Sequence, residues 1–150
     1  VAAEFGNFDR MMTVSEAAAA VDGSQMGLLE EQTISFSDLL YMMLLKSGND
    51  AATVIAENLC GSTEKFVELM NQKLEELGLS DSAHFTNCVG LYDEAHYCPI
   101  YDMAIIMREI ADYELLKELG KVWMYDMNHS GGRITSLTNI PLSRYVLSGK

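Results

Sequence analysis

Residues 44–52, Leu-Leu-Lys-Ser-Gly-Asn-Asp-Ala-Ala, join two helical patterns and decide how the rest of the chain is interpreted. The first pattern ends just before Ser47 and the second begins at Asp50. Between them, Ser47, Gly48 and Asn49 predict a tight corner that holds a hydroxyl and a carboxamide side by side, with a glycine that lets another backbone come close. Such a corner suits a proton relay and an amide clamp. The same tripeptide is also typical of a plain helix C-cap followed by an N-cap, so its context has to decide.

The composition is that of one acidic globular domain over residues 1–150. Hydrophobic residues make up 49% and charged residues 21%, and the formal net charge is −12. Because an acidic surface repels phosphate backbones and anionic lipid, nucleic-acid binding is disfavoured. The longest apolar run, residues 39–45, is too short to span a membrane. The sequence shows neither internal repeats nor a linker.

The periodicity predicts a mainly α fold with a small β-hairpin. Helices are expected over residues 36–46, 50–59, 62–77, 99–110 and 114–119. Extended pieces are expected over residues 12–14 and 33–35, and hairpin strands over 122–125 and 134–138, joined by residues 128–132. Ser35 and Ser62 are placed to cap helices. The helix from Asp50 to Leu59 is apolar almost all round, which is typical of a helix buried on most sides.

Metal and disulfide signatures are absent from the sequence. Three cysteines lack a C-x-x-C spacing, so they are expected to be buried free thiols: Cys60, Cys88 and Cys98. A few other residues could be imagined around a metal, but their spacing matches no metal motif: His84, His96, His129, Asp93 and Glu94. We therefore expect no metal and no cofactor.

The corner is one of several short motifs that occur in a fixed order along the chain: Thr13-Val14-Ser15, Gly23-Ser24, Asp38-Leu39-Leu40-Tyr41, Ser47-Gly48-Asn49-Asp50-Ala51-Ala52, His84-Phe85-Thr86-Asn87, Gly90-Leu91, His96-Tyr97 and Tyr101-Asp102-Met103-Ala104. Together they resemble the low-molecular-weight D-alanyl-D-alanine carboxypeptidases of the penicillin-binding, serine β-lactamase-like superfamily. The agreement runs from Thr13 to Arg108. It implies the helical subdomain of the DD-peptidase/β-lactamase-like fold.

The resemblance also implies a mechanism. In the family, the serine of an S-x-x-K motif attacks the carbonyl between the two terminal D-alanines of a peptidoglycan stem peptide, and water then hydrolyses the acyl-enzyme. Ser47 matches the serine of the S-x-N motif, which relays a proton to the leaving amine, and Asn49 matches the asparagine that holds the lysine and the substrate amide. Gly48 would line the substrate with them. A K-T-G strand binds the substrate carboxylate and borders the oxyanion hole. The implied partners are stem peptides and β-lactams, and the implied location is the cell envelope, outside the cytoplasm.

The sequence departs from the family at both of the other motifs. No S-x-x-K precedes Ser47, and no K-T-G follows the predicted hairpin. One S-x-x-K string, Ser62-Thr63-Glu64-Lys65, comes after Ser47, and we interpret it as a helix N-cap. Cys98-Pro99 stands where the family usually has Ser or Thr before a helix.

The simplest hypothesis is that the chain is the helical part of a carboxypeptidase domain and is inactive alone. The chain opens at Val1 without an initiator methionine, which agrees with a processed or shortened protein. The apolar helix 50–59 would then expose surface that met the rest of the domain, so self-association is expected. Two alternatives stay open: a non-catalytic module that binds peptidoglycan peptides, and a helical interaction domain unrelated to the cell wall. The full reading frame would separate them.

Overall fold

The computed structural model describes residues 1–122, 124–128 and 134–138. The chain divides into two compact units, which are described separately. One unit is formed by Val1–Gly6 and Ala56–Lys117, and the other by Asn7–Ile55 and the described residues from Glu118 onward. The expectation of a single partial domain over residues 1–150 stays a prediction.

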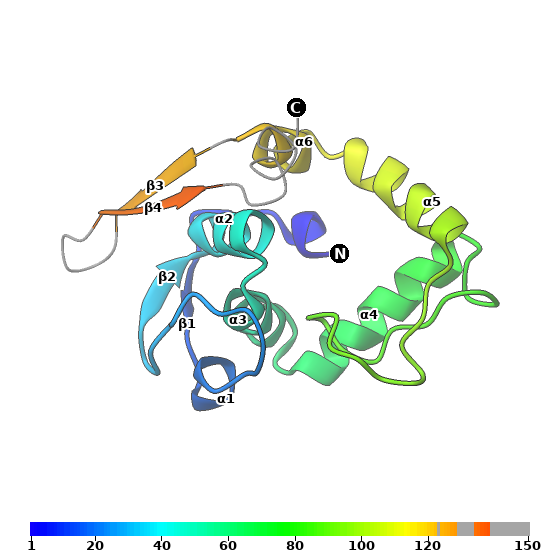
Figure 1. Ribbon diagram of the computed structural model, residues 1–150, viewed down its shortest axis with the longest axis horizontal. Coiled ribbons are helices and arrows are strands. Elements are labelled where there is room, and N and C mark those ends of the chain that lie inside the picture. The colour runs from blue at the N-terminus through cyan, green and yellow to red at the C-terminus, as the bar shows by residue number, and fades with distance from the viewer. Residues whose placement is uncertain (123, 129–133, 139–150) are drawn as a thin grey trace, which may run out of the picture. The chain divides into compact units, whose positions relative to one another are not determined.

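The second unit contains a short antiparallel sheet. Strands β1 (Met11–Thr13) and β2 (Thr33–Ser35) pair antiparallel (Figure 1), with Met12 opposite Ile34. The Met12 and Ile34 side chains are buried, while Met11 is exposed. Alternation along each strand therefore turns one apolar face inward. Helix α1 (Glu16–Ala19) follows β1. Both extended pieces predicted from the sequence are confirmed, the first displaced by one residue.

Helix α2 (Phe36–Lys46) carries much of the buried surface of this unit. It begins as predicted, because the Ser35 hydroxyl oxygen accepts a hydrogen bond from the Asp38 N–H at 3.1 Å. Its buried side chains are all apolar: Phe36, Leu39, Leu40, Met42 and Leu45. Leu44, although it belongs to the apolar run 39–45, is 39% exposed.

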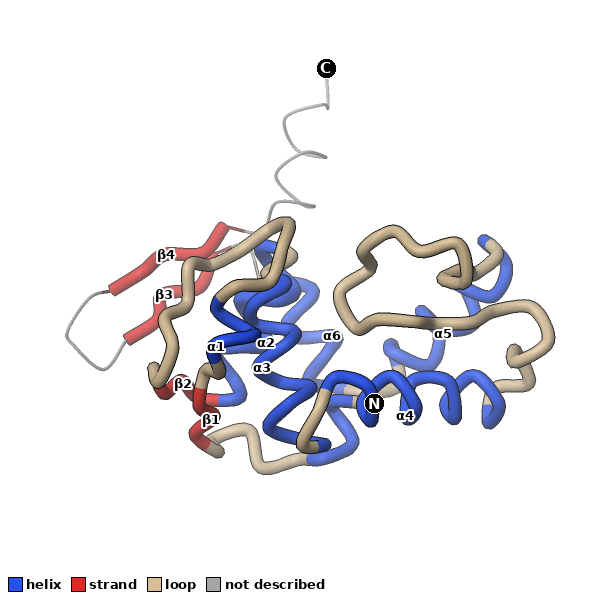
Figure 2. Tube along the Cα trace, turned by 90° about the horizontal axis from the view of Figure 1, so that it is seen from below, coloured by secondary structure: helices blue, strands red, loops and turns tan. Residues whose placement is uncertain are grey.

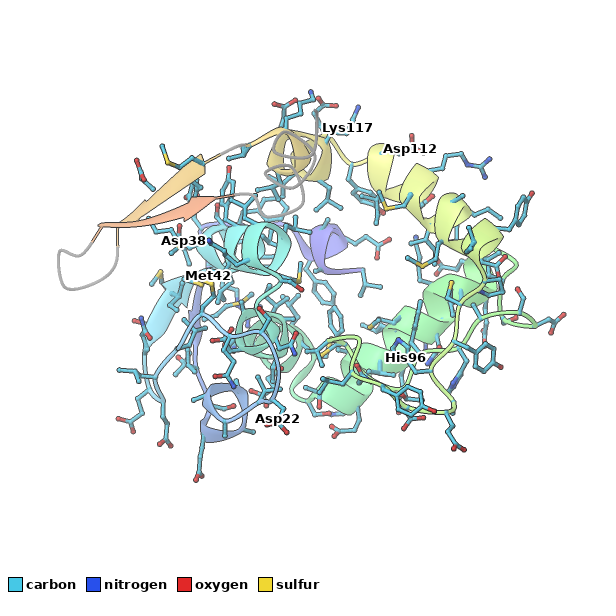
Figure 3. All side chains as sticks on the ribbon, viewed as in Figure 1. Asp22, Asp38, Met42, His96, Asp112 and Lys117 are labelled. Atoms are coloured by element: carbon cyan, nitrogen blue, oxygen red, sulfur yellow. The ribbon has the colours of Figure 1, made fainter. Side chains whose placement is uncertain are left out.

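The predicted hairpin is confirmed and contacts α2, but its first strand, expected over residues 122–125, lies over 124–128, so Asn128 belongs to the strand and not to the joining residues. Strand β3 (Met124–Asn128) pairs antiparallel with β4 (Ile134–Thr138). Trp123 and the joining residues 129–132 lie outside the described residues. The Tyr125 ring stacks on Tyr41 with centroids 3.5 Å apart, and its hydroxyl donates to Asp38 Oδ1 at 2.9 Å. Burial, reinforced by Asp38, raises the pKa of Tyr125 to about 12. Figure 3 labels Asp38 and Met42 on α2.

The first unit is built on two helices, α4 (Thr63–Glu76) and α5 (Ile100–Ala111). They meet through a cluster of Leu74, Leu79 and Ala83, against which Ile105 and Ile106 of α5 pack. Asp102 is buried on α5 and accepts a hydrogen bond from the Ser82 hydroxyl. The tube in Figure 2 follows the long loop that leads into α5.

Within the first unit, a salt-bridge network ties the short 3₁₀ helix η1 (Ala2–Phe5) to α4 and α5. Lys73 of α4 lies 2.7 Å from Glu4, 3.1 Å from Glu76 and 3.4 Å from Glu109. Hydrogen bonding to Glu4, then to Glu76, raises the pKa of Lys73. The Tyr113 hydroxyl donates to the same Glu4 at 2.8 Å. The network therefore holds the start of the chain against α4 and α5.

Several helix boundaries differ from the expectations by one or two residues. Helix α3 (Asn49–Cys60) begins at Asn49 rather than Asp50. Pro99 is the N-cap of α5 and makes no side-chain cap, whereas we expected it as the first helical residue. Gly120 lies inside α6 (Glu114–Lys121) and does not stop it. A glycine in a helix interior costs about 1 kcal/mol relative to alanine, which surrounding contacts can offset.

The largest correction concerns where apolar surface is exposed. Residues 51–56 of α3 are all buried, so the expectation that this helix leaves a bare apolar face is wrong. Large exposed apolar side chains lie on α5 instead: Ile100, Tyr101, Met103 and Met107. Periodicity identifies a helix, but it does not say which apolar side chains a neighbour covers. None of the helices described here is long and apolar enough to cross a bilayer.

Candidate functional site

The Ser47–Gly48 corner lies between two helices, as the sequence predicts. Helix α2 ends at Lys46, and Ser47 is its C-cap with φ 58° and ψ 41°, in the left-handed region. A residue with a Cβ pays roughly 1–2 kcal/mol for that conformation, which glycine adopts freely. Strain of this kind persists only where neighbouring structure fixes it, and it is common at functional sites.

The two polar residues of the corner have different surroundings. Ser47 is exposed, and its hydroxyl makes no hydrogen bond within the described part of the chain. Asn49 is only 8% exposed, and its Nδ2 donates to the Asp22 carbonyl at 2.7 Å. Its backbone N–H donates to the Ser24 carbonyl, also at 2.7 Å. The hydroxyl is therefore available to a partner, while the carboxamide is held in one plane.

Gly48 is closely packed at this corner. A Cβ at this position would lie 3.0 Å from Met26 Cγ, 3.1 Å from Asp50 Oδ1 and 3.4 Å from the Met42 carbonyl. The close approach that we predicted from the glycine is thus present, although a side chain and a carboxylate stand nearest rather than a second backbone.

Asp50 is a residue whose part in the site the sequence analysis missed. It is 1% exposed, and its Oδ2 accepts hydrogen bonds from the N–H groups of Met26, Gly27 and Leu28 at 2.8, 2.9 and 3.2 Å. Its Oδ1 accepts from the Ala51 N–H at 2.9 Å, one of the first amides of α3, which have no partner within the helix. The turn residues between Asp22 and Gly27 were the available signal, but nothing in the sequence says which group their amides meet.

The string Ser62-Thr63-Glu64-Lys65 is a helix N-cap, as predicted. The Ser62 hydroxyl oxygen accepts a hydrogen bond from the Lys65 N–H at 3.3 Å, and α4 begins at Thr63. The Ser62 backbone is extended, with φ −160° and ψ 160°. Its oxygen therefore satisfies a backbone donor at a helix start.

The motifs between His84 and Tyr97 brace a loop. His84 and Tyr97 form an isolated antiparallel bridge, with N–H to carbonyl distances of 2.8 and 2.9 Å (His96, beside it, is labelled in Figure 3). The Asn87 side-chain oxygen accepts from the Gly90 N–H at 2.7 Å. These contacts give the motif residues a structural use within the first unit.

Metal-binding side chains do not gather in the structure as described. Within residues 1–122, 124–128 and 134–138, no three His, Cys, Asp or Glu side chains form a group able to hold a metal ion. His129 lies outside the described residues. The cysteines Cys60, Cys88 and Cys98 are free, as expected, but they are half-buried rather than buried. Burial raises the pKa of the Cys88 thiol. The expectation of no metal and no cofactor stays a prediction.

Comparison with known proteins identifies relatives across most of the chain. A family model described as D-alanyl-D-alanine carboxypeptidase matches residues 4–144. The D-alanyl-D-alanine carboxypeptidase DacF of Bacillus subtilis is 42% identical over 106 residues, which are 71% of this chain and 27% of DacF.

Solved structures agree with the sequence matches. The D-alanyl-D-alanine carboxypeptidase DacD from Francisella tularensis aligns with a TM-score of 0.79 and 30% identity, covering 89% of this chain and 32% of that protein. Penicillin binding protein 6B from Escherichia coli aligns with a TM-score of 0.79 and 28% identity, covering 92% of this chain and 44% of that protein. The chain thus spans about a quarter to a half of the lengths of these relatives.

Proposed function

The chain belongs to the D-alanyl-D-alanine carboxypeptidase family, and we propose that the full-length protein containing it is a serine-type hydrolase of this activity. It removes the terminal D-alanine of peptidoglycan stem peptides through an acyl-enzyme. The observation that carries the proposal is the Ser47–Gly48–Asn49 corner inside the matched region, with an exposed hydroxyl on a strained backbone and a fixed carboxamide beside it in the chain.

In this proposal Ser47 and Asn49 divide the work of the corner. The Ser47 hydroxyl passes a proton to the amine of the departing D-alanine. Asn49 offers its carboxamide to the substrate amide and to the lysine that activates the nucleophile. One Nδ2 hydrogen is donated to Asp22, and the second hydrogen and the oxygen take no part in that bond. Gly48 keeps the corner compact.

The nucleophile is expected from a part of the protein outside this chain. Residues 1–46 contain no S-x-x-K string, and Ser62 is engaged in a helix cap. A serine needs a base within hydrogen-bond reach and donors for the oxyanion before it can attack. This chain alone is therefore inactive in the proposal.

The same proposal names partners and a location. The full-length protein binds stem peptides ending in D-Ala-D-Ala and is acylated by β-lactams, and it acts at the cell envelope. One of the relatives carries penicillin binding in its name, which supports the β-lactam part. Self-association is proposed through the exposed side chains of α5, such as Ile100 and Tyr101, in place of α3.

Release of D-alanine from a D-Ala-D-Ala peptide by the full-length protein tests the proposal. We expect release from this peptide and none from the matched peptide ending in L-alanine. Binding of the peptide without release would instead favour the non-catalytic binding module. That alternative is kept because residues 1–46 lack the S-x-x-K string.

A further inference from the structure

A buried carboxylate lies directly behind the Ser47–Gly48–Asn49 corner. Asp50 is 1% exposed and accepts four backbone hydrogen bonds. A buried charge is costly unless it is paired or well hydrogen-bonded, and no salt bridge to Asp50 occurs among the described residues. Backbone amides alone therefore satisfy this carboxylate.

The two oxygens of Asp50 serve different parts of the chain. Oδ1 accepts from Ala51 and so satisfies one of the first amides of α3, which have no partner within the helix. Oδ2 accepts three consecutive N–H groups of a remote segment, residues 26–28. The second set is not needed to begin a helix. These three hydrogen bonds fix the segment 22–28, which contains neither a strand nor a helix.

The opposite end of the same segment holds the corner. The Asp22 carbonyl accepts from Asn49 Nδ2, and the Ser24 carbonyl accepts from the Asn49 N–H. The Ser24 hydroxyl donates to the Lys46 carbonyl at 3.1 Å, at the last residue of α2. A continuous series of contacts thus runs from Asp50 through residues 26–28 to Asp22 and Ser24, and back to Asn49.

We propose that Asp50 is a positioning residue, which sets the plane of the Asn49 carboxamide through the segment 22–28. The proposal rests on the proposed function of Asn49. Replacing Asp50 by asparagine keeps the side-chain volume but removes the charge. It leaves one oxygen for two sets of donors and turns an NH₂ group toward N–H groups. The segment is then released, and Asn49 loses its fixed acceptor.

The test compares Asp50→Asn with Asp102→Asn, a matched change at a second buried aspartate. Asp102 is 5% exposed, accepts a hydrogen bond from Ser82 and lies in the other unit. In the full-length protein we expect Asp50→Asn to lower kcat for D-alanine release about 10²-fold with little change in KM, because small misplacement of a catalytic group costs about that much. Asp102→Asn should leave kcat within about twofold.

A second readout in the 150-residue chain does not depend on activity. In ¹⁵N-labelled wild-type chain, one Asn49 side-chain proton should be shifted by its bond to Asp22 and should exchange slowly with water. Asp50→Asn should abolish the shift and speed exchange at least about tenfold, and Asp102→Asn should change neither. If Asp50→Asn does not fold, Ser24→Ala at an exposed position perturbs the same segment and should have the same effects in smaller measure.

The outcomes separate the two proposals. Unchanged Asn49 signals in both Asp50→Asn and Ser24→Ala would overturn the positioning role. Loss of activity equal in Asp50→Asn and Asp102→Asn would do the same, since it would show general destabilisation. If the wild-type protein released no D-alanine, the proposed function would fail, while the Asn49 signals would still decide the role of Asp50.

Discussion

Two serines of this chain lie in short motifs typical of catalysis, and they differ in backbone conformation and in the hydrogen bonding of their hydroxyl groups. Ser62 heads an S-x-x-K string, yet its oxygen accepts a hydrogen bond at the start of α4 and its backbone is relaxed and extended. Ser47 ends α2 with a left-handed backbone, and its hydroxyl is exposed. A motif match is therefore weak evidence of catalysis until the hydrogen bonds of the hydroxyl and the conformational strain of the backbone are known.

The difference also shows in the residues behind each serine. Behind Ser47, six hydrogen bonds join the segment 22–28 to Lys46, Asn49 and Asp50, and Asn49 makes two of them. Ser62 precedes an exposed Lys65, whose side chain is absent from the salt bridges of the described residues. A site that must hold reacting groups in place needs the first kind of support.

The largest expected effect is on the rate of D-alanine release, which should depend on Ser47 and not on Ser62. In the full-length protein, Ser47→Ala should lower the rate of D-alanine release about 10²–10⁴-fold, because a positioned proton relay is removed. The free energy of unfolding should change by less than about 1 kcal/mol, because an exposed hydroxyl is lost. Ser62→Ala is the matched control and should leave the rate unchanged. Equal rates for Ser47→Ala and wild type would remove Ser47 from the mechanism.

A smaller effect is expected on stability, where replacement by glycine should act in opposite directions at Ser47 and Ser62. Ser47→Gly should raise the free energy of unfolding by about 1 kcal/mol, because glycine adopts the left-handed conformation without strain. The same substitution at Ser62 should lower it by a few tenths of a kcal/mol, since glycine is a tolerated N-cap. Urea unfolding of the chain gives both values. A destabilised Ser47→Gly variant would mean that the strain is absent.

The smallest effect tests the cap itself. Ser62→Ala should lower the free energy of unfolding by about 0.5–1 kcal/mol, because the Lys65 N–H loses its acceptor. Thermal unfolding followed by circular dichroism measures it. Ser62→Asp keeps an acceptor at the helix start and should restore stability. A Ser62→Ala variant as stable as wild type would show that the hydroxyl is free for another use.

Local signals in the sequence were enough to predict most of the helices and caps near the site. The Ser35 and Ser62 caps, the break at Ser47–Gly48 and the existence of α2, α3, α4 and α5 all depend on neighbouring residues, and all are confirmed. These features follow from capping and periodicity, which need no knowledge of distant segments.

Contacts between segments distant in the sequence could not be predicted from these local signals. The bond from Asn49 to Asp22 and the three amides on Asp50 link residues more than twenty positions apart. The same limit explains α3 and α5: both are apolar, but residues 51–56 are covered while Ile100 and Met107 are not. Which apolar face is covered depends on the neighbour and not on the pattern itself.

Labelling with a fluorescent penicillin, read by denaturing gel and intact mass, tests the central claim that Ser62 is a helix cap and not the nucleophile. The full-length protein should gain one penicilloyl group on a serine outside residues 1–150, and the 150-residue chain should gain none. Both should keep these results after Ser62→Ala. A stoichiometric adduct mapped to Ser62 in the chain would contradict the account, because it would place the nucleophile in a helix cap.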